Sequence, residues 1–256
     1  MRNLICMCRC GMSLLLVLTV FKVLGNTLCG TALTQMDQAV SGEVVWGIGQ
    51  KLLERGPVIC IDAGHGGKDN GSDYRKRMEK DDNLRLAREV AVYLKEKGVR
   101  VLLTREEDTF LSLKERCDFA NEKQADYFVS LHRNSGTGTG VETWVNSEAS
   151  ERTIRMAEAI MEKLDGAGIQ RNRGVRKGSY NSDSENYYVN AYLEMPSCIV
   201  EMGFIGDSTD NALFDKNLES YAAAIGEAIL QTWQDDAKEE QNAKNSVTET
   251  AQDKNL

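Results

Sequence analysis

The sequence has only two histidines, His65 and His132, and each stands at the end of a predicted buried strand. His65 lies within the glycine-rich segment DAGHGG at residues 62–67, and His132 ends the segment SLH at residues 130–132. Glycines hold a histidine close to the backbone and leave space around its ring. A lone histidine is more often structural than functional, but a pair at two strand ends favours ligands of a metal ion.

Glu79 is the best candidate for a third ligand. A catalytic zinc ion usually takes three protein ligands, often two histidines and one carboxylate, and keeps a position for water. Glu79 lies in a polar segment just before an amphipathic helix, where an acid can also serve only to complement the positive end of the helix. Asp81 and Asp82 suit that second role equally well. The residue pattern leaves all three acids open, with Glu79 modestly ahead.

A further candidate is Glu201, which follows the apolar run at residues 197–200. A carboxylate is costly to bury without compensation, so it should face either a partner or a site. Beside a metal ion, it would act as a general base toward water and then as an acid toward a leaving amine. The alternative is an ion pair with an arginine such as Arg133 or Arg173.

Other patterns for hydrolysis or nucleotide binding are missing from the sequence. No Gly-Lys-Ser/Thr follows the glycine pairs, and the glycine spacing does not fit dinucleotide binding. There is no Gly-x-Ser-x-Gly segment, and no spare histidine is left to activate a serine or a cysteine.

The elements that must position these residues alternate between strand and helix. Ser112 and Glu115 have the spacing of a capping box at a helix start. Such alternation predicts an α/β fold, a single three-layer domain with a mostly parallel central sheet between helices, and sites beyond the carboxyl ends of its strands. The predicted strands are at residues 58–61, 99–103, 127–131, 141–145 and 197–200, and the predicted helices at 83–97, 112–122, 154–164 and 218–233.

The two ends of the chain differ in composition from its centre. An apolar run at residues 11–24 is shorter than the ~20 residues of a membrane span. It predicts a signal peptide within residues 1–32, or alternatively an uncleaved anchor, and hence an exported protein. The other predicted segments are a lead-in linker at 33–56, the catalytic domain at 57–233 and a disordered acidic tail at 234–256.

Charge and cysteine content narrow the class of protein further. The 256 residues have a formal net charge of −8, which argues against a nucleic-acid partner, because binding phosphates needs a basic face. Outside the targeting region, the cysteines are Cys60, Cys117 and Cys198. Three cysteines cannot all form disulfides within one chain, so we expect buried unpaired thiols rather than a disulfide framework.

Several segments, in order along the chain, resemble the zinc-dependent N-acetylmuramoyl-L-alanine amidases of type 3. They are ICIDAGHGG at 59–67, EKDDNL at 79–84, LTR at 103–105 with LSL at 111–113, SLHRN at 130–134, GVET at 140–143 and PSCIVEMGFI at 196–205. One such motif alone would be weak evidence, whereas the ordered set is highly specific. The resemblance covers the chain from about residue 57 to about residue 233.

The resemblance implies a sheet of about six strands, one zinc ion, and hydrolysis of the bond between N-acetylmuramic acid and L-alanine. By the same resemblance, His65, Glu79 and His132 are the zinc ligands, which selects Glu79 over its acidic neighbours. Glu201 is the catalytic carboxylate.

The resemblance also implies further roles and partners. Asn134 and Glu142 are expected to line the substrate groove or support the ligands, the alternatives being a turn residue and a surface acid. The partner is then peptidoglycan of the bacterial envelope, cut during wall remodelling or lysis as by an autolysin. We expect a monomer that meets a membrane only through an uncleaved N-terminal segment.

Some residues depart from the family pattern without removing a ligand or the base. Arg133 stands where a small residue is more usual, residues 178–192 fit loosely, and Gly206 and Asp207 replace a more usual polar pair. These departures bear on substrate preference. Two alternatives remain, namely another zinc peptidase that cuts wall stem peptides and a catalytically silent peptidoglycan-binding module.

Overall fold

The structure is a computed structural model that describes residues 56–253, and the side chains of residues 56–242. The predicted signal peptide and all but the last residue of the predicted linker lie outside the described residues. None of the described helices is both long enough and apolar enough to cross a membrane.

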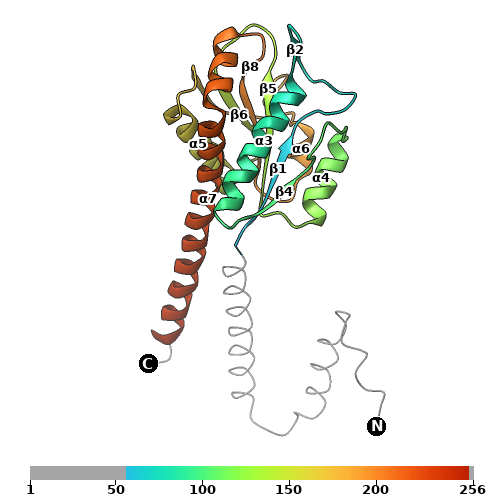
Figure 1. Cartoon of the computed structure of the whole chain (residues 1–256). Helices are drawn as coiled ribbons and strands as arrows, with labels where there is room; N and C mark the ends of the chain where they lie inside the picture. Colours follow the sequence, from blue (N-terminus) through green and yellow to red (C-terminus); the bar gives the residue numbers. More distant parts are fainter. Residues whose placement is uncertain (1–55, 254–256) are drawn as a thin grey trace, which may run out of the picture. The chain divides into compact units, whose positions relative to one another are not determined.

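A six-stranded sheet forms the centre of the described domain, with strand order β4-β1-β5-β8-β6-β7 (Figure 1). Neighbouring strands are parallel except β6 and β8, so β6 and β7 run against the rest of the sheet. The strands are β1 (Val58–Ala63), β4 (Arg100–Leu103), β5 (Tyr127–Asn134), β6 (Val141–Val145), β7 (Asn172–Lys177) and β8 (Ser197–Phe204). The predicted α/β fold with a mostly parallel sheet is confirmed.

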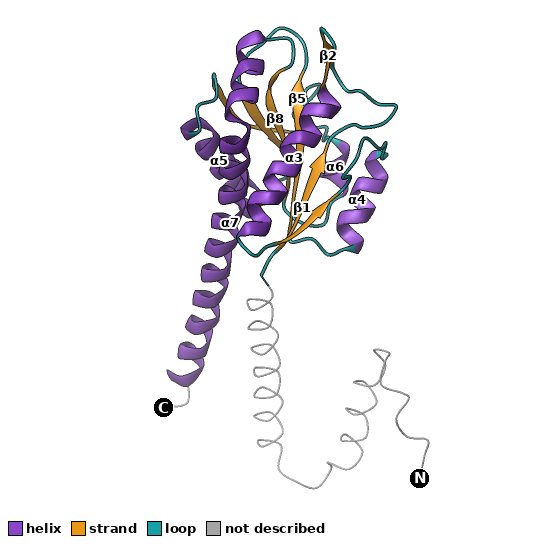
Figure 2. Ribbon diagram, viewed as in Figure 1, coloured by secondary structure: helices purple, strands orange, loops and turns teal. Residues whose placement is uncertain are grey.

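Helices cover both faces of this sheet and complete three layers (Figure 2). α3 and α5 both pack against α7, and α4 packs against α6. A two-stranded ribbon of β2 (Asp73–Tyr74) and β3 (Arg77–Met78) precedes α3. The helices are α3 (Glu79–Glu96), α4 (Leu113–Glu122), α5 (Glu151–Gly166), α6 (Tyr188–Tyr192) and α7 (Ser208–Asp253).

Each face of the sheet has its own apolar cluster. Ile59, Val129 and Val200 pack with residues of α3, α5 and α7, whereas Cys60 and Phe128 pack with residues of α4 and α6. Successive residues of a strand point to opposite faces, which explains the alternation. The same rule turns the polar side chains near the strand ends toward the α4–α6 face, where they form the site.

The helix α3 begins earlier than predicted, at Glu79 rather than at residue 83. Its first turn contains Glu79, Asp81 and Asp82, which have no apolar periodicity to reveal a helix. The start predicted for α4 is confirmed, because Ser112 and Glu115 form both bonds of the capping box. Neither β7 nor α6 was predicted, since β7 is a polar edge strand and α6 has only five residues.

The helix α7 continues to Asp253, where the sequence predicted a disordered tail from residue 234. Asp236 is only 5% exposed and accepts hydrogen bonds from Tyr127 and Arg155, each at 2.6 Å, and from Arg152. Polar contacts with the domain therefore hold the first turns beyond residue 233, although no apolar pattern predicts them.

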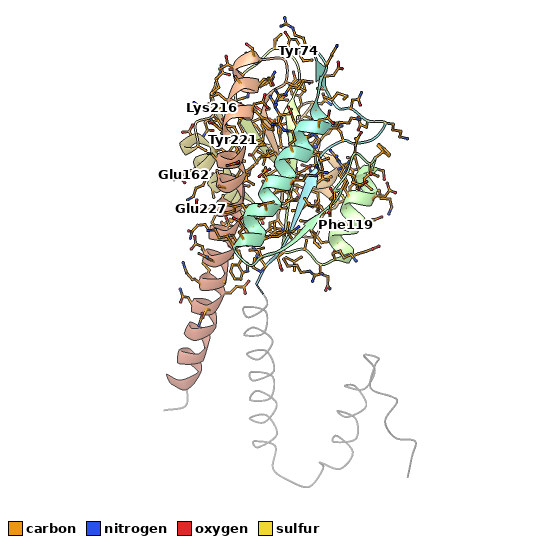
Figure 3. All side chains as sticks on the ribbon, viewed as in Figure 1. Tyr74, Phe119, Glu162, Lys216, Tyr221 and Glu227 are labelled. Atoms are coloured by element: carbon orange, nitrogen blue, oxygen red, sulfur yellow. The ribbon has the colours of Figure 1, made fainter. Side chains whose placement is uncertain are left out.

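Side-chain contacts also join α7 to α5 and to the loop after it. They involve Tyr221 and Glu227, both labelled on α7 in Figure 3. Tyr221 of α7 donates a hydrogen bond to the carbonyl of Gly168 at 3.2 Å. Glu227, one turn and a half further along, accepts one from Lys163 of α5 at 2.8 Å. On the sheet and α4, Cys60, Cys117 and Cys198 are free and buried, as predicted.

Candidate active site

The ends of β1 and β5 and the start of α3 bring the three candidate ligands together. Glu79 lies between two imidazole rings, with its Oε1 atom 3.1 Å from His65 Nε2 and 2.9 Å from His132 Nδ1. One ligand atom from each residue lies within 4.8 Å of the other two. Two nitrogens and one carboxylate oxygen are a donor set that catalytic zinc takes, so these residues fit that ion.

Two glycines leave the space that this group occupies. A Cβ atom on Gly64 would lie 2.3 Å from the His132 ring, and one on Gly71 would lie 2.5 Å from the His65 ring and 2.6 Å from a Glu79 oxygen. Gly71 also has a φ of +63°, a conformation that favours glycine. The three candidate ligands can therefore lie this close together only because Gly64 and Gly71 have no side chain.

Hydrogen bonds fix the position of His65, whose φ of 60° is uncommon for a residue with a side chain. The buried Arg116 donates to the carbonyl of His65 at 2.7 Å and to that of Ala63 at 2.8 Å, and it pairs with Asp62 at 2.6 Å. On the ring itself, Nδ1 lies 2.9 Å from an oxygen of Asp69. Such a contact orients a ligand histidine and leaves Nε2 facing Glu79.

The three groups stabilise one another's charges. Burial alone would lower the pKa of His65, but hydrogen bonds to Glu79 and Asp69 and their charges raise it to about 9. Burial works against ionisation of Glu79 as well, yet its two histidine partners hold the pKa of that carboxyl well below its ordinary value. A cation that binds here has to replace protons on the histidines.

Glu201 lies beside this group, on β8, in register with His132 of the neighbouring strand. Its Oε2 atom is buried and has no hydrogen-bond partner among the described residues. Burial raises the pKa of Glu201 to about 7. The arginines considered as partners, Arg133 and Arg173, each pair with another acid. A buried carboxylate oxygen without a hydrogen-bond partner is unusual and is typical of a group that exchanges protons with a substrate.

Arg133 does not enter the site, although it follows His132 directly. Strand alternation turns its side chain to the other face of the sheet, where it pairs with Asp82 at 2.5 Å and lies over the ring of Phe214. Its backbone N–H donates to Glu79 at 3.1 Å. Arg133 therefore contributes to the site through its backbone N–H group, while its side chain packs on the opposite face of the sheet.

Asn134 and Glu142 are hydrogen bonded to each other at 2.8 Å, rather than separate as a turn residue and a surface acid. Glu142 is 3% exposed and also accepts from Arg173 at 2.6 Å and from the Trp144 ring at 3.2 Å. Because β6 runs against β8, the start of β6 lies beside the carboxyl end of β8, where Glu142 pairs in register with Glu201.

A cleft of about 850 Å³ opens over these residues. The three candidate ligands, Glu201, Asn134 and Glu142 all contribute to its lining. Sequence reasoning missed Asp69, Asp62 and Arg116. The position of Asp62 at the end of a buried strand could have indicated a buried ion pair. Nothing in the local pattern distinguishes Asp69 from other loop acids.

One cleft of this three-layer fold contains the His–Glu–His group and the unpaired Glu201 oxygen. This arrangement is typical of a hydrolase domain whose side chains can bind a metal ion. The model of the family described as N-acetylmuramoyl-L-alanine amidase matches residues 59–231, and the chain belongs to this family of amide hydrolases.

The chain is also similar to individual curated proteins and to solved structures. The chain is 38% identical over 207 residues to the uncharacterized protein YqiI of Bacillus subtilis, covering 79% of this chain and 91% of that protein. It is 34% identical over 194 residues to N-acetylmuramoyl-L-alanine amidase LytC of Bacillus subtilis, covering 74% of this chain but only 35% of LytC. The crystal structure of an N-acetylmuramoyl-L-alanine amidase from Clostridium difficile 630 matches with a TM-score of 0.65 and 29% identity, over 70% of this chain and 98% of that one.

Proposed function

We propose that the chain uses a zinc ion to hydrolyse the amide bond between N-acetylmuramic acid and L-alanine in peptidoglycan. The observation that supports this most strongly is the convergence of His65, Glu79 and His132 beside Glu201, whose buried Oε2 atom has no hydrogen-bond partner among the described residues. Membership of the amidase family supports the choice of the bond.

In this proposal, His65, Glu79 and His132 hold the ion. When bound, zinc supplies Lewis acidity, which lowers the pKa of water toward roughly 7 and polarises a carbonyl. Asp69 accepts the Nδ1 proton of His65 and so keeps Nε2 available as a ligand.

Glu201 moves the protons. It takes a proton from the attacking water and later gives it to the departing nitrogen of L-alanine, so one carboxylate acts first as base and then as acid. Its raised pKa suits this exchange, because a carboxyl with a pKa near neutrality can both accept and donate a proton. Asn134 and Glu142 line the same cleft and are proposed to support the substrate.

The proposal places the enzyme outside the cell or in the bacterial envelope, where peptidoglycan is found. Relatives named as cell-wall amidases, such as the probable cell wall amidase LytH of Staphylococcus aureus, support this location.

Two substitutions separate the roles of ligand and base. We expect Glu201→Gln to retain zinc and lose at least about 100-fold in turnover on purified peptidoglycan, since proton transfer is what it removes. His65→Ala should lose both zinc and turnover. Zinc content by mass spectrometry and release of amino termini would be measured on the same preparations. A Glu201→Gln variant with near-native turnover would rule out Glu201 as the base.

A further inference from the structure

The cleft has an exposed aromatic side chain that the proposed chemistry does not use. Tyr180 lines the same cleft as His65 and Glu201, yet its side chain is 82% exposed. Exposed aromatic surface next to a reaction centre is typical of a binding site, because a flat ring offers much contact area and little conformational entropy to lose.

The loop that presents Tyr180 is anchored at several points. The backbones of Ser179 and Ser182 are hydrogen bonded in both directions, at 3.0 and 3.2 Å. The N–H group of Tyr180 donates to the hydroxyl of Tyr187 at 3.3 Å, and Asn186 uses both amide atoms to bind the loop after β6. The backbone of Tyr180 is thus held in place while its ring faces solvent, which lowers the cost of ordering on binding.

The composition of this loop suits a neutral polar ligand. Residues 178–187 include the exposed Asp183 and Glu185 and follow the exposed Arg176 and Lys177, so charges of both signs flank the loop. Its other residues are mainly serine, asparagine and tyrosine. An N-acetylated sugar has no charge, and it offers C–H faces to an aromatic ring and hydroxyl and acetamide groups to serine and asparagine.

Phe110, another exposed aromatic residue of the cleft, has a different setting. Its ring centre lies 4.4 Å from the ammonium group of Lys68, and the exposed acids Glu106, Glu107 and Asp108 come just before it in the chain. Charged groups close to the ring suit a charged peptide better than a neutral sugar. The uncharged polar side chains around Tyr180 make its loop the better match for the glycan.

We propose that Tyr180 is a specificity-determining residue that stacks against an N-acetylhexosamine ring of the glycan strand. Because the Tyr180 side chain is far more exposed than Glu201, we assign this ring to a sugar beyond the muramic acid whose amide is cut. The inference rests on the proposed function and adds that the enzyme prefers muramoyl peptides within a glycan to those on a single sugar. It also gives a role to part of segment 178–192, which fits the family pattern loosely.

The test compares two soluble substrates with the same stem peptide, one on a single N-acetylmuramic acid and one within a tetrasaccharide, cut by the zinc-loaded full chain. We expect wild type to have the higher kcat/KM on the tetrasaccharide. Tyr180→Ala should reduce this preference by about 10-fold, the upper range for a lost aromatic contact. Tyr180→Phe should keep it, because the ring remains. Tyr192→Ala removes a 60% exposed tyrosine outside the cleft and should also keep it.

The outcomes separate this inference from the proposed function. An unchanged preference in Tyr180→Ala, or an equal loss on both substrates, would overturn the stacking role. So would a Tyr180→Phe variant as poor as Tyr180→Ala. Failure of wild type to cut either substrate would contradict the proposed function instead. Even then, titration with a peptide-free tetrasaccharide should give a Kd about 10-fold lower for wild type than for Tyr180→Ala, and equal Kd values would overturn the inference.

Discussion

At the scale of single residues, the chemistry of the site depends on which groups hold protons. His65 faces a carboxylate on each side of its ring, Asp69 at Nδ1 and Glu79 at Nε2. Despite burial, these acids raise the pKa of His65 to about 9, so the ring is positively charged at neutral pH in the metal-free protein. A ligand histidine must be neutral, which means that zinc has to displace this proton.

We therefore predict that zinc binding to the metal-free full chain releases protons at about pH 7 and weakens as the pH falls below about 9. Calorimetry in two buffers with different ionisation enthalpies would measure the released protons. Asp69→Asn removes one of the charges that raise the pKa of His65 and should release fewer. Heats that do not depend on the buffer would show that His65 is not protonated before zinc binds.

The residue scale also shows what the sequence could predict. His65, His132 and Glu201 could be selected as candidates because they follow apolar runs, which mark strand ends without any knowledge of the tertiary structure. The residue pattern left Glu79 among three acids, and the family resemblance selected it. The fold adds a physical reason against Asp82, which is buried against Arg133. Asp69 was missed because its role depends on how a glycine-rich loop folds back onto His65.

At the scale of elements, the loop between β1 and α3 shapes the candidate metal site through glycines. Gly71→Ala should abolish zinc binding, because its Cβ would lie 2.5 Å from the His65 ring and 2.6 Å from Glu79. Gly98→Ala is a matched control, since Gly98 has a similar φ of +77° but open space around its Cβ position. It should lose only about 1–2 kcal/mol of stability from backbone strain and keep its zinc. Zinc content and thermal unfolding of both variants would be compared.

If Gly71→Ala kept full zinc content, the close packing of this loop on the ligands would not be required. Loss of zinc in both variants would attribute the effect to backbone strain rather than to the filled space.

At the same scale, α7 is attached to the domain by contacts beyond residue 233, where the sequence did not predict a helix. Asp236→Ala removes the acceptor of the Tyr127 hydroxyl and of two arginines, which should reduce the free energy of unfolding by about 1–3 kcal/mol. Asp235→Ala removes only exposed contacts and should cost less than about 0.5 kcal/mol. Urea unfolding of both variants would measure the difference.

The difference in the free energy of unfolding between Asp236→Ala and Asp235→Ala should depend on pH. Burial alone would raise the pKa of Asp236, but the hydrogen bonds and charges of Tyr127, Arg155 and Arg152 lower it below its ordinary value. The contribution of Asp236 to stability is therefore present at neutral pH and lost as the pH falls through the lowered pKa. A gap between the two variants that persisted in strong acid would contradict an ionic role.

At the scale of the whole molecule, the layered architecture could be predicted because strand and helix alternate along the chain with clear apolar periodicity. The reversed direction of β6 and β7 could not, because β7 has a polar sequence and lies at the sheet edge. That reversal matters for the site, since it places Glu142 beside Glu201. The fold thus adds the buried acid Glu142 to the cleft, whereas a parallel β6 would place it at the opposite end of the sheet.

The most direct test of the account is the mass of the products that the zinc-loaded full chain releases from purified peptidoglycan. We predict intact stem peptides that begin with L-alanine and glycan strands that retain whole muramic acid residues. Fragments cut inside the peptide, with muramic acid still bound to L-alanine, would keep the metal site but contradict the proposed bond.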